Sequence, residues 1–164
     1  MQVQEAIKER HSCRNFNSTP IAVNLIEALI DAARLAPTAR NIQPWEFIAV
    51  TQKEVLQKLG QLADHGRFIR DAACCIAVLC EDTKYYLEDG SAATENILLT
   101  ATDLGLASCW VAGDKKDYCQ KVKELLGAPQ DLKLVSLVAL GYAQGKTQAP
   151  RKRVLKEVLH WEKF

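Results

Sequence analysis

Two short segments of the chain hold the side chains most able to bind a charged or polar ligand. The first runs from Arg10 to Arg14, RHSCR, where two arginines four positions apart flank the hydroxyl of Ser12. Arginine presents a planar fork of donors that matches phosphate oxygens, and serine adds one more donor. The segment therefore predicts an anion-binding grip. The alternative is a solvated basic patch at the end of a helix.

The second segment is a polar loop, residues 36–44, between an apolar helix and a strand-like run. Pro37 and Pro44 fix φ and remove two backbone donors, so a helix cannot continue through the loop. Four side chains between the prolines can hydrogen-bond a polar ligand, namely Thr38, Arg40, Asn41 and Gln43. A pre-shaped loop between rigid elements is a common place to hold a ligand. The alternative is an ordinary surface connection.

Composition narrows the class of protein. The 164 residues, 48% of them apolar, predict one domain over residues 1–164 with a real core. The net charge of +1 does not indicate nucleic acid or an acidic membrane as partner. No apolar run is long enough to span a membrane and no signal peptide is evident, so the cytoplasm is expected. The six cysteines include no CxxC pair, which favours free thiols and no metal site.

The apolar spacing predicts the elements that must position these segments. Helical periodicity indicates helices over residues 2–10, 23–35, 54–62 and 88–106. Strands are expected over residues 45–50, 72–80, 107–113 and 132–142, and the continuous apolar run at 72–80 suits a central strand covered on both faces. Residues 66–71 suit a loop or a helical turn. Helices that alternate with strands indicate an α/β (α+β) fold, a three-layer α-β-α sandwich.

Three further features concern helix ends and the chain end. Asp114 and Asp117 resemble a capping box that opens a helix closing at Gly127, and Gly105 is a natural end for the 88–106 helix. The small residues on that long helix make it a candidate for the middle of an interface. The tail, residues 150–164, carries six large apolar side chains that need burial on their own domain or on a second copy.

Several enzyme classes are disfavoured by what the sequence lacks. The glycine signatures GxGxxG and GxxxxGK[ST] are absent. Their absence argues against a Rossmann dinucleotide domain and against a P-loop nucleotidase. The three histidines come with no recognisable nucleophile motif.

Four segments in register carry a resemblance to a known family. RHSCRNF at 10–16 is similar to RxSxRxF, and APTARNIQPW at 36–45 is similar to APSxxNxQPW, with Thr for the usual Ser. DLGLASCWVAG at 103–113 is similar to LGLgsxWxG. The fourth segment is LGY at 140–142 with RK to HWE over 151–162. The chain thus resembles the nitroreductase family of FMN-dependent oxidoreductases over nearly its whole length, and is short for that family.

The resemblance implies a homodimer with two FMN sites at the subunit interface. The cofactor-binding residues that it implies are Arg10, His11, Ser12, Arg14 and Arg151 around the phosphate and ribityl; Pro37, Thr38, Ala39 and Asn41 from the second subunit; and Val111, Ala112 and Gly113. The Ala112-Gly113 backbone would face the flavin N5 and O4 edge. The stretch around 65–68 is a further contact in longer relatives, and the family's tail crosses to the partner subunit.

The activity implied is flavin-centred, so neither a catalytic side chain nor a metal is expected. Electrons would pass from NADH or NADPH to an electron-poor acceptor, nitroaromatic or quinone-like, by a ping-pong mechanism. Two alternatives stay open: another reductive reaction on the same scaffold, or a flavin-binding or regulatory protein without significant turnover.

Overall fold

A four-stranded antiparallel sheet forms the centre of the computed structural model, which describes residues 1–145 and 149–164. The strand order is β1-β2-β4-β3, with bounds β1 Trp45–Val50, β2 Cys74–Cys80, β3 Ala107–Ala112 and β4 Lys133–Gly141. All four predicted strands are present. The outer strands are β1 and β3, so among the described residues each has one edge that no other strand of the sheet pairs with.

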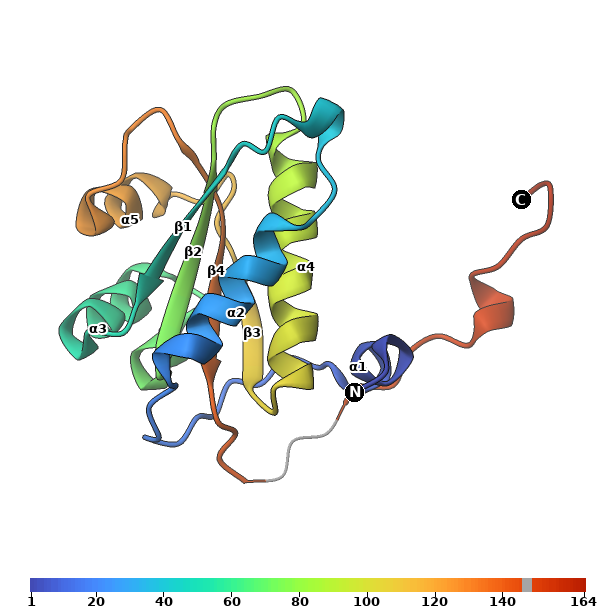
Figure 1. Ribbon diagram of the computed structural model, residues 1–164, viewed down its shortest axis with the longest axis horizontal. Helices are drawn as coiled ribbons and strands as arrows, with labels where there is room; N and C mark the ends of the chain where they lie inside the picture. The colour runs from blue at the N-terminus through green and yellow to red at the C-terminus, as the bar shows by residue number, and fades with distance from the viewer. Residues whose placement is uncertain (146–148) are drawn as a thin grey trace.

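Helices cover both faces of the sheet (Figure 1). Their bounds are α1 Val3–Glu9, α2 Val23–Arg34, α3 Lys53–Leu62, α4 Tyr86–Asp103 and α5 Cys119–Leu126. One apolar cluster joins α3 and α5 to the sheet, and a second joins α2 and α4 to its other face. The predicted three-layer sandwich is confirmed.

The strand β2 is the centre of the core. All of its residues are buried, and its side chains alternate between the two apolar clusters. Burial raises the pKa values of Cys74 and Cys80 to about 12, so these thiols behave as small apolar groups. The predicted central strand and the predicted free thiols are both confirmed.

The helix α4 begins two residues before its predicted start and ends as glycine predicts. Gly105 adopts φ +73°, its N–H donates to the carbonyl of Thr102 at 3.1 Å, and the N–H of Leu106 donates to that of Ala101 at 2.8 Å. These two bonds form a Schellman motif. It turns the chain directly into β3.

The predicted capping box at Asp114 and Asp117 is wrong. The helix α5 begins only at Cys119, and the Asp114 carboxylate instead accepts a hydrogen bond of 2.6 Å from the hydroxyl of Tyr86. This bond, helped by burial, raises the pKa of Tyr86 to about 12. Asp114 therefore ties the end of β3 to the start of α4. The predicted helix end at Gly127, with φ +64°, is confirmed.

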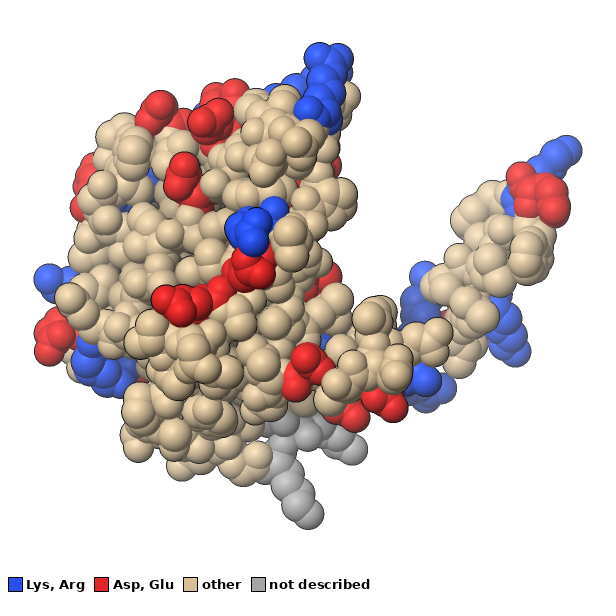
Figure 2. Space-filling model, viewed as in Figure 1, with Lys and Arg blue, Asp and Glu red and all other residues tan. Residues whose placement is uncertain are grey.

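The C-terminal tail, residues 149–164, does not pack on its own domain. It stands clear of the body beyond α1 and carries several Lys and Arg side chains (Figures 1 and 2). Its apolar side chains are exposed; Leu155 is 71% and Trp161 76% accessible. Of the two sequence-based expectations for the tail, docking on its own domain is not seen. In the described ranges, no helix has the length and apolar character needed to cross a bilayer.

Candidate functional site

The predicted anion grip is held against the sheet as an extended segment. Ser12 forms a parallel bridge with Ser108 of β3, and the N–H of Cys13 donates to the Ser108 carbonyl at 2.8 Å. The side chains then alternate, because Cys13 is buried beneath the segment while Ser12 and Arg14 are exposed. The sheet thus presents a hydroxyl and a guanidinium side by side to solvent.

Aromatic and acidic neighbours set the position of the two arginines. The guanidinium of Arg14 lies 5.8 Å from the ring centroid of Phe68, a cation–π contact that places the 65–68 stretch beside the grip. Arg10 Nε lies 3.7 Å from Glu95 Oε1, so part of its charge is balanced by α4. Arg14 has no ion pair among residues 1–145 and 149–164 and is the freer cation.

His11 and Arg151, which were also predicted to bind the phosphate and ribityl, do not have the same surroundings as Ser12 and Arg14. His11 is held by its own turn, with Nδ1 2.7 Å from the carbonyl oxygen of Glu9, and it lines an open cavity of about 500 Å³ beside Cys13 and Ser108. Arg151 lies in the exposed tail and, within the described residues, forms no hydrogen bond with the grip. One chain therefore brings together Arg10, Ser12 and Arg14 but not Arg151.

The buried Cys109 thiol lies beneath the grip. Burial raises its pKa, and the positive charge of Arg14 with a hydrogen bond from Ser12 opposes that rise only partly. A thiol kept protonated is a poor nucleophile. Cys109 is therefore a packing residue under the grip.

The polar loop is fixed by a residue that the sequence did not indicate, Asp89 of α4. Its carboxylate accepts from the hydroxyl of Thr38 at 2.8 Å and from the N–H of Ala39 at 3.2 Å. Asp89 is only 5% accessible, although acidic residues in a first helical turn are usually solvated. Only the three-dimensional contact distinguishes it from the neighbouring exposed Glu88.

The backbone of this loop is strained. Arg40, Asn41 and Gln43 all adopt φ near +57°, a region that side chains other than glycine rarely occupy. Strain of this kind costs about 1–3 kcal/mol per residue and persists only where neighbouring contacts impose it. The hydrogen bonds that Asp89 accepts from Thr38 and Ala39 supply that constraint, and they hold Asn41 in an exposed position.

A third polar feature lies at the end of β3. The N–H of Gly113 points toward β4, where it donates to the Val135 carbonyl at 3.0 Å. Because adjacent residues of a strand point their polar groups in opposite directions, the N–H of Ala112 faces the open edge of the sheet. The carbonyl of Ser108, which accepts from Cys13 on that same edge, agrees with this alternation.

The other two backbone positions predicted here serve the fold. The Val111 side chain is buried in the core. A Cβ on Gly113 would lie 2.8 Å from Leu134 Cγ and 2.9 Å from the Leu134 carbonyl oxygen, so β4 alone accounts for a glycine at this position. The edge donor of the site is therefore Ala112, whose carbonyl in turn accepts from the Tyr118 hydroxyl.

The grip, Ala112 and the polar loop lie at different places along the molecule. The grip and Ala112 lie on one strand edge, about 13 Å apart at roughly 3.3 Å per residue from Ser108 to Ala112. The polar loop is bound near the start of α4, whereas the N-terminal segment contacts its end through Met1 and Asp103. Those two points on α4 are about 21 Å apart at 1.5 Å per residue. Figure 1 shows the loop and α1 at opposite ends of α4.

The chemistry that this arrangement supports is binding of an elongated ligand. Its anionic end fits Ser12 and Arg14, and a hydrogen-bond acceptor further along fits the N–H of Ala112. A backbone donor does not titrate, so it serves a ligand whose own charge changes. Within the described residues no cluster of His, Cys, Asp or Glu could hold a metal ion.

Comparisons with known proteins agree with this geometry. The family model described as Nitroreductase family matches residues 7–73 and 65–142. A protein of Archaeoglobus fulgidus with the provisional name NADH dehydrogenase/NAD(P)H nitroreductase is 38% identical over 144 residues, 83% of this chain and 82% of that protein.

Solved structures are similar over the whole length. An FMN-dependent nitroreductase from Clostridium difficile superposes with a TM-score of 0.91 at 27% identity, over 97% of this chain and 98% of that one. A nitroreductase with bound FMN from Bacteroides fragilis gives a TM-score of 0.82 at 25% identity, over 99% and 100%.

Proposed function

The chain belongs to the nitroreductase family, and on that premise we propose that it is an FMN-dependent oxidoreductase. In this proposal it transfers electrons from NADH or NADPH to an electron-poor acceptor such as a nitroaromatic or a quinone. The observation that carries the proposal is the shared edge of β3. An anion grip at Ser12 and Arg14 and the edge-facing N–H of Ala112 lie on it, about 13 Å apart.

The residues present fit FMN. A phosphate monoester fits the exposed hydroxyl and guanidinium of Ser12 and Arg14, and arginine is the side chain best matched to phosphate oxygens. The flavin ring needs a donor for N5 that does not titrate, and the N–H of Ala112 meets that need. When bound, the flavin supplies the redox chemistry, and the protein binds and orients it.

A homodimer would complete the site. An interface with two-fold symmetry places the same surface of both chains in contact. If the axis crosses α4 near its middle, the two α4 helices run antiparallel, and the polar loop of one chain comes beside the grip of the other. The residues that the loop would bring to the partner's flavin are Pro37, Thr38, Ala39 and Asn41. The polar loop is bound at Asp89 near the start of α4, whereas Ser12 of the grip bridges Ser108, just beyond the end of that helix, and this separation supports the arrangement over a site within one chain.

The chain's own residues then have separate tasks. Arg14 and Ser12 hold the anionic end, while the Tyr118 hydroxyl fixes the Ala112 carbonyl and with it the direction of the Ala112 N–H. None of these groups has to move a proton. One open ring face would serve donor and acceptor in turn, which is the ping-pong order of events.

The purified protein tests the proposal directly. We expect a yellow protein that contains FMN and oxidises NADH or NADPH when a quinone or a nitroaromatic is added. A colourless protein that takes up no FMN on reconstitution would refute the proposal. FMN binding without reduction by either nucleotide would leave a flavin-binding protein without turnover.

Replacing Arg14 tests the grip. Arg14→Ala should weaken FMN binding by roughly 1.5–3 kcal/mol, about 10- to 100-fold, the usual cost of losing a charge-assisted hydrogen bond. Arg14→Lys should restore only part, because an ammonium cannot reproduce the planar fork. Flavin fluorescence titration of the apoprotein measures both. Parental affinity in both variants would make Arg14 a surface charge only.

Replacing Ala112 tests the edge donor. Ala112→Ser keeps the N–H and should change flavin reduction little, whereas Ala112→Pro removes it and should slow reduction by NADH or NADPH. Proline is tolerated where the N–H faces outward from an edge strand, so no bond to β4 is lost. Stopped-flow absorbance gives the rates, and circular dichroism checks the fold. A folded, FMN-loaded proline variant with the parental rate would show that this donor is not used.

A further inference from the structure

A small pocket of about 120 Å³ lies between the polar loop and the turn that precedes α4. Its lining is Ala39, Arg40, Ile42, Thr83, Lys84, Tyr85 and Asp89, and we refer to it as the Arg40 pocket. We propose that this pocket binds the 2′-phosphate of NADPH while that nucleotide reduces the partner subunit's flavin. The inference rests on the proposed function, and it names the electron donor that this site prefers.

Two cations without acidic partners border the pocket. Arg40 and Lys84 are both exposed, and neither forms an ion pair in the part of the chain that the structure describes. Asp89 also lines the pocket, but both of its oxygens accept hydrogen bonds from Thr38 and Ala39. Its negative charge remains, but the two exposed cations outnumber this one buried carboxylate, so the pocket as a whole favours an anion.

A buried hydroxyl points to a polar ligand. Thr83 Oγ1 is shielded from solvent and has no hydrogen-bond partner among the described residues, a costly state for a buried donor. A phosphate oxygen in the pocket would accept from it. The same ligand would thus satisfy both cations and the hydroxyl.

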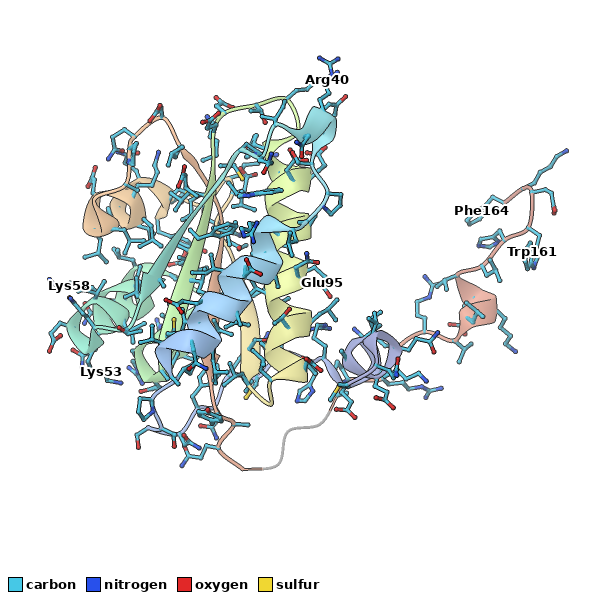
Figure 3. All side chains as sticks on the ribbon, viewed as in Figure 1. Arg40, Lys53, Lys58, Glu95, Trp161 and Phe164 are labelled. Carbon is cyan, nitrogen blue, oxygen red and sulfur yellow. The ribbon has the colours of Figure 1, made fainter. Side chains whose placement is uncertain are left out.

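The loop backbone at the rim of the pocket is fixed before any ligand binds. Arg40 has φ +57° and ψ +20°, and the adjacent Ala39 is bound to the buried Asp89. Figure 3 shows the Arg40 side chain at the tip of the loop, directed away from the body. Because the loop backbone is already ordered, binding a phosphate would order only the Arg40 side chain and not the loop, so less interaction energy is lost to ordering.

The chemistry and position of the pocket select the ligand. Tyr85 is exposed beside Lys84, whose ammonium lies 5.1 Å from the ring centroid, so a purine can stack where two cations bind phosphate. A phosphate together with a purine is the 2′-phosphoadenosine part of NADPH, which NADH lacks. Arg40 lies between Ala39 and Asn41, which the proposed dimer places at the partner's flavin. The nucleotide's phosphate would therefore lie at the rim of that site.

Titration of the oxidised, FMN-loaded protein with NADP⁺ and with NAD⁺ tests the proposal. NADP⁺ should bind more tightly, as measured by calorimetry and by the change in the flavin spectrum. Arg40→Gln should weaken NADP⁺ binding about tenfold and leave NAD⁺ binding unchanged, with a similar effect for Lys84→Gln. Lys58→Gln on α3, far from the loop in Figure 3, is the matched control and should match the parent.

The outcomes separate this inference from the proposed function. Equal binding of NADP⁺ and NAD⁺ by the parent would overturn it, as would a preference that survives in both pocket variants. If NADH and NADPH then reduce the flavin equally well, the oxidoreductase proposal still stands. If neither nucleotide reduces the flavin, that proposal fails, and the titration with the oxidised nucleotides still decides whether the pocket binds phosphate.

Discussion

Asp89→Ala should release the polar loop and weaken FMN binding more than any single change in the loop itself. The substitution removes the acceptor of both the Thr38 hydroxyl and the Ala39 N–H, and it removes the constraint on the strained backbone from Arg40 to Gln43. Both donors are half-buried, and a buried donor left unpaired costs about 1–3 kcal/mol. We therefore expect a loss of roughly 2–4 kcal/mol in the free energy of unfolding, with FMN affinity at least about tenfold weaker.

Two companion variants separate loop positioning from general damage. Glu88→Ala removes an exposed acid from the same helical turn and should behave as the parent. Asp89→Asn keeps the shape and one acceptor oxygen, so it should fall between the parent and Asp89→Ala. Fluorescence titration gives the FMN affinity and denaturant unfolding gives the stability. An Asp89→Ala protein that unfolds more easily but binds FMN as the parent does would show that the loop does not hold the flavin.

The effect of Asp89→Ala on FMN binding should appear in the site whose grip belongs to the partner chain. In the proposed dimer, the loop fixed by Asp89 serves the flavin of the other subunit. A heterodimer of an Asp89→Ala chain with an Arg14→Ala chain would then combine one site with both defects and one site with neither. Such a mixed dimer should retain one tightly bound FMN, whereas either variant alone should retain none at that affinity. Two equally weakened sites in the mixed dimer would place loop and grip in the same chain's site.

Sequence patterns were sufficient for the layers of the fold. The continuous apolar run at 72–80 suited a central strand covered on both faces, and the two glycines at 105 and 127 closed the helices where the structure closes them. These features are local, because a few neighbouring residues fix the periodicity or the positive φ. The same local reasoning failed at Asp114, whose carboxylate bonds Tyr86 from another element and caps no helix.

In the candidate site, too, residues identified by local spacing were predictable and residues that depend on long-range contacts were not. The motif residues Ser12 and Arg14 could be named from their spacing, since an extended segment exposes alternate side chains. Asp89 could not, because its role depends on a contact with residues 50 positions away. The resemblance placed Gly113 with Ala112 at the flavin edge, and the structure by itself already requires a glycine there for packing against Leu134. Long-range contacts of this kind leave no periodic trace in one sequence.

Deleting residues 155–164 should abolish the dimer and with it the retained FMN. The deleted segment exposes five large apolar side chains in the single chain, namely Leu155, Val158, Leu159, Trp161 and Phe164. Full burial of a side chain of this kind contributes about 1.5–3 kcal/mol, so their burial on a partner would contribute on the order of 10 kcal/mol before the costs of association. Size-exclusion chromatography with light scattering should therefore show a monomer or an aggregate in place of the dimer.

The position of the cut makes this test specific. Arg151 remains in the truncated chain, so the deletion does not itself remove the side chain predicted to contact the phosphate. Residues 155–164 are all exposed in the single chain, so in a protein that works as a monomer the deletion would leave both folding and flavin unchanged. Trp161→Ala combined with Phe164→Ala keeps the full length and should weaken the dimer to a smaller degree. A soluble monomer that still holds FMN after the deletion would refute the shared site, because the grip and Ala112 would then bind the flavin without a loop from the second chain.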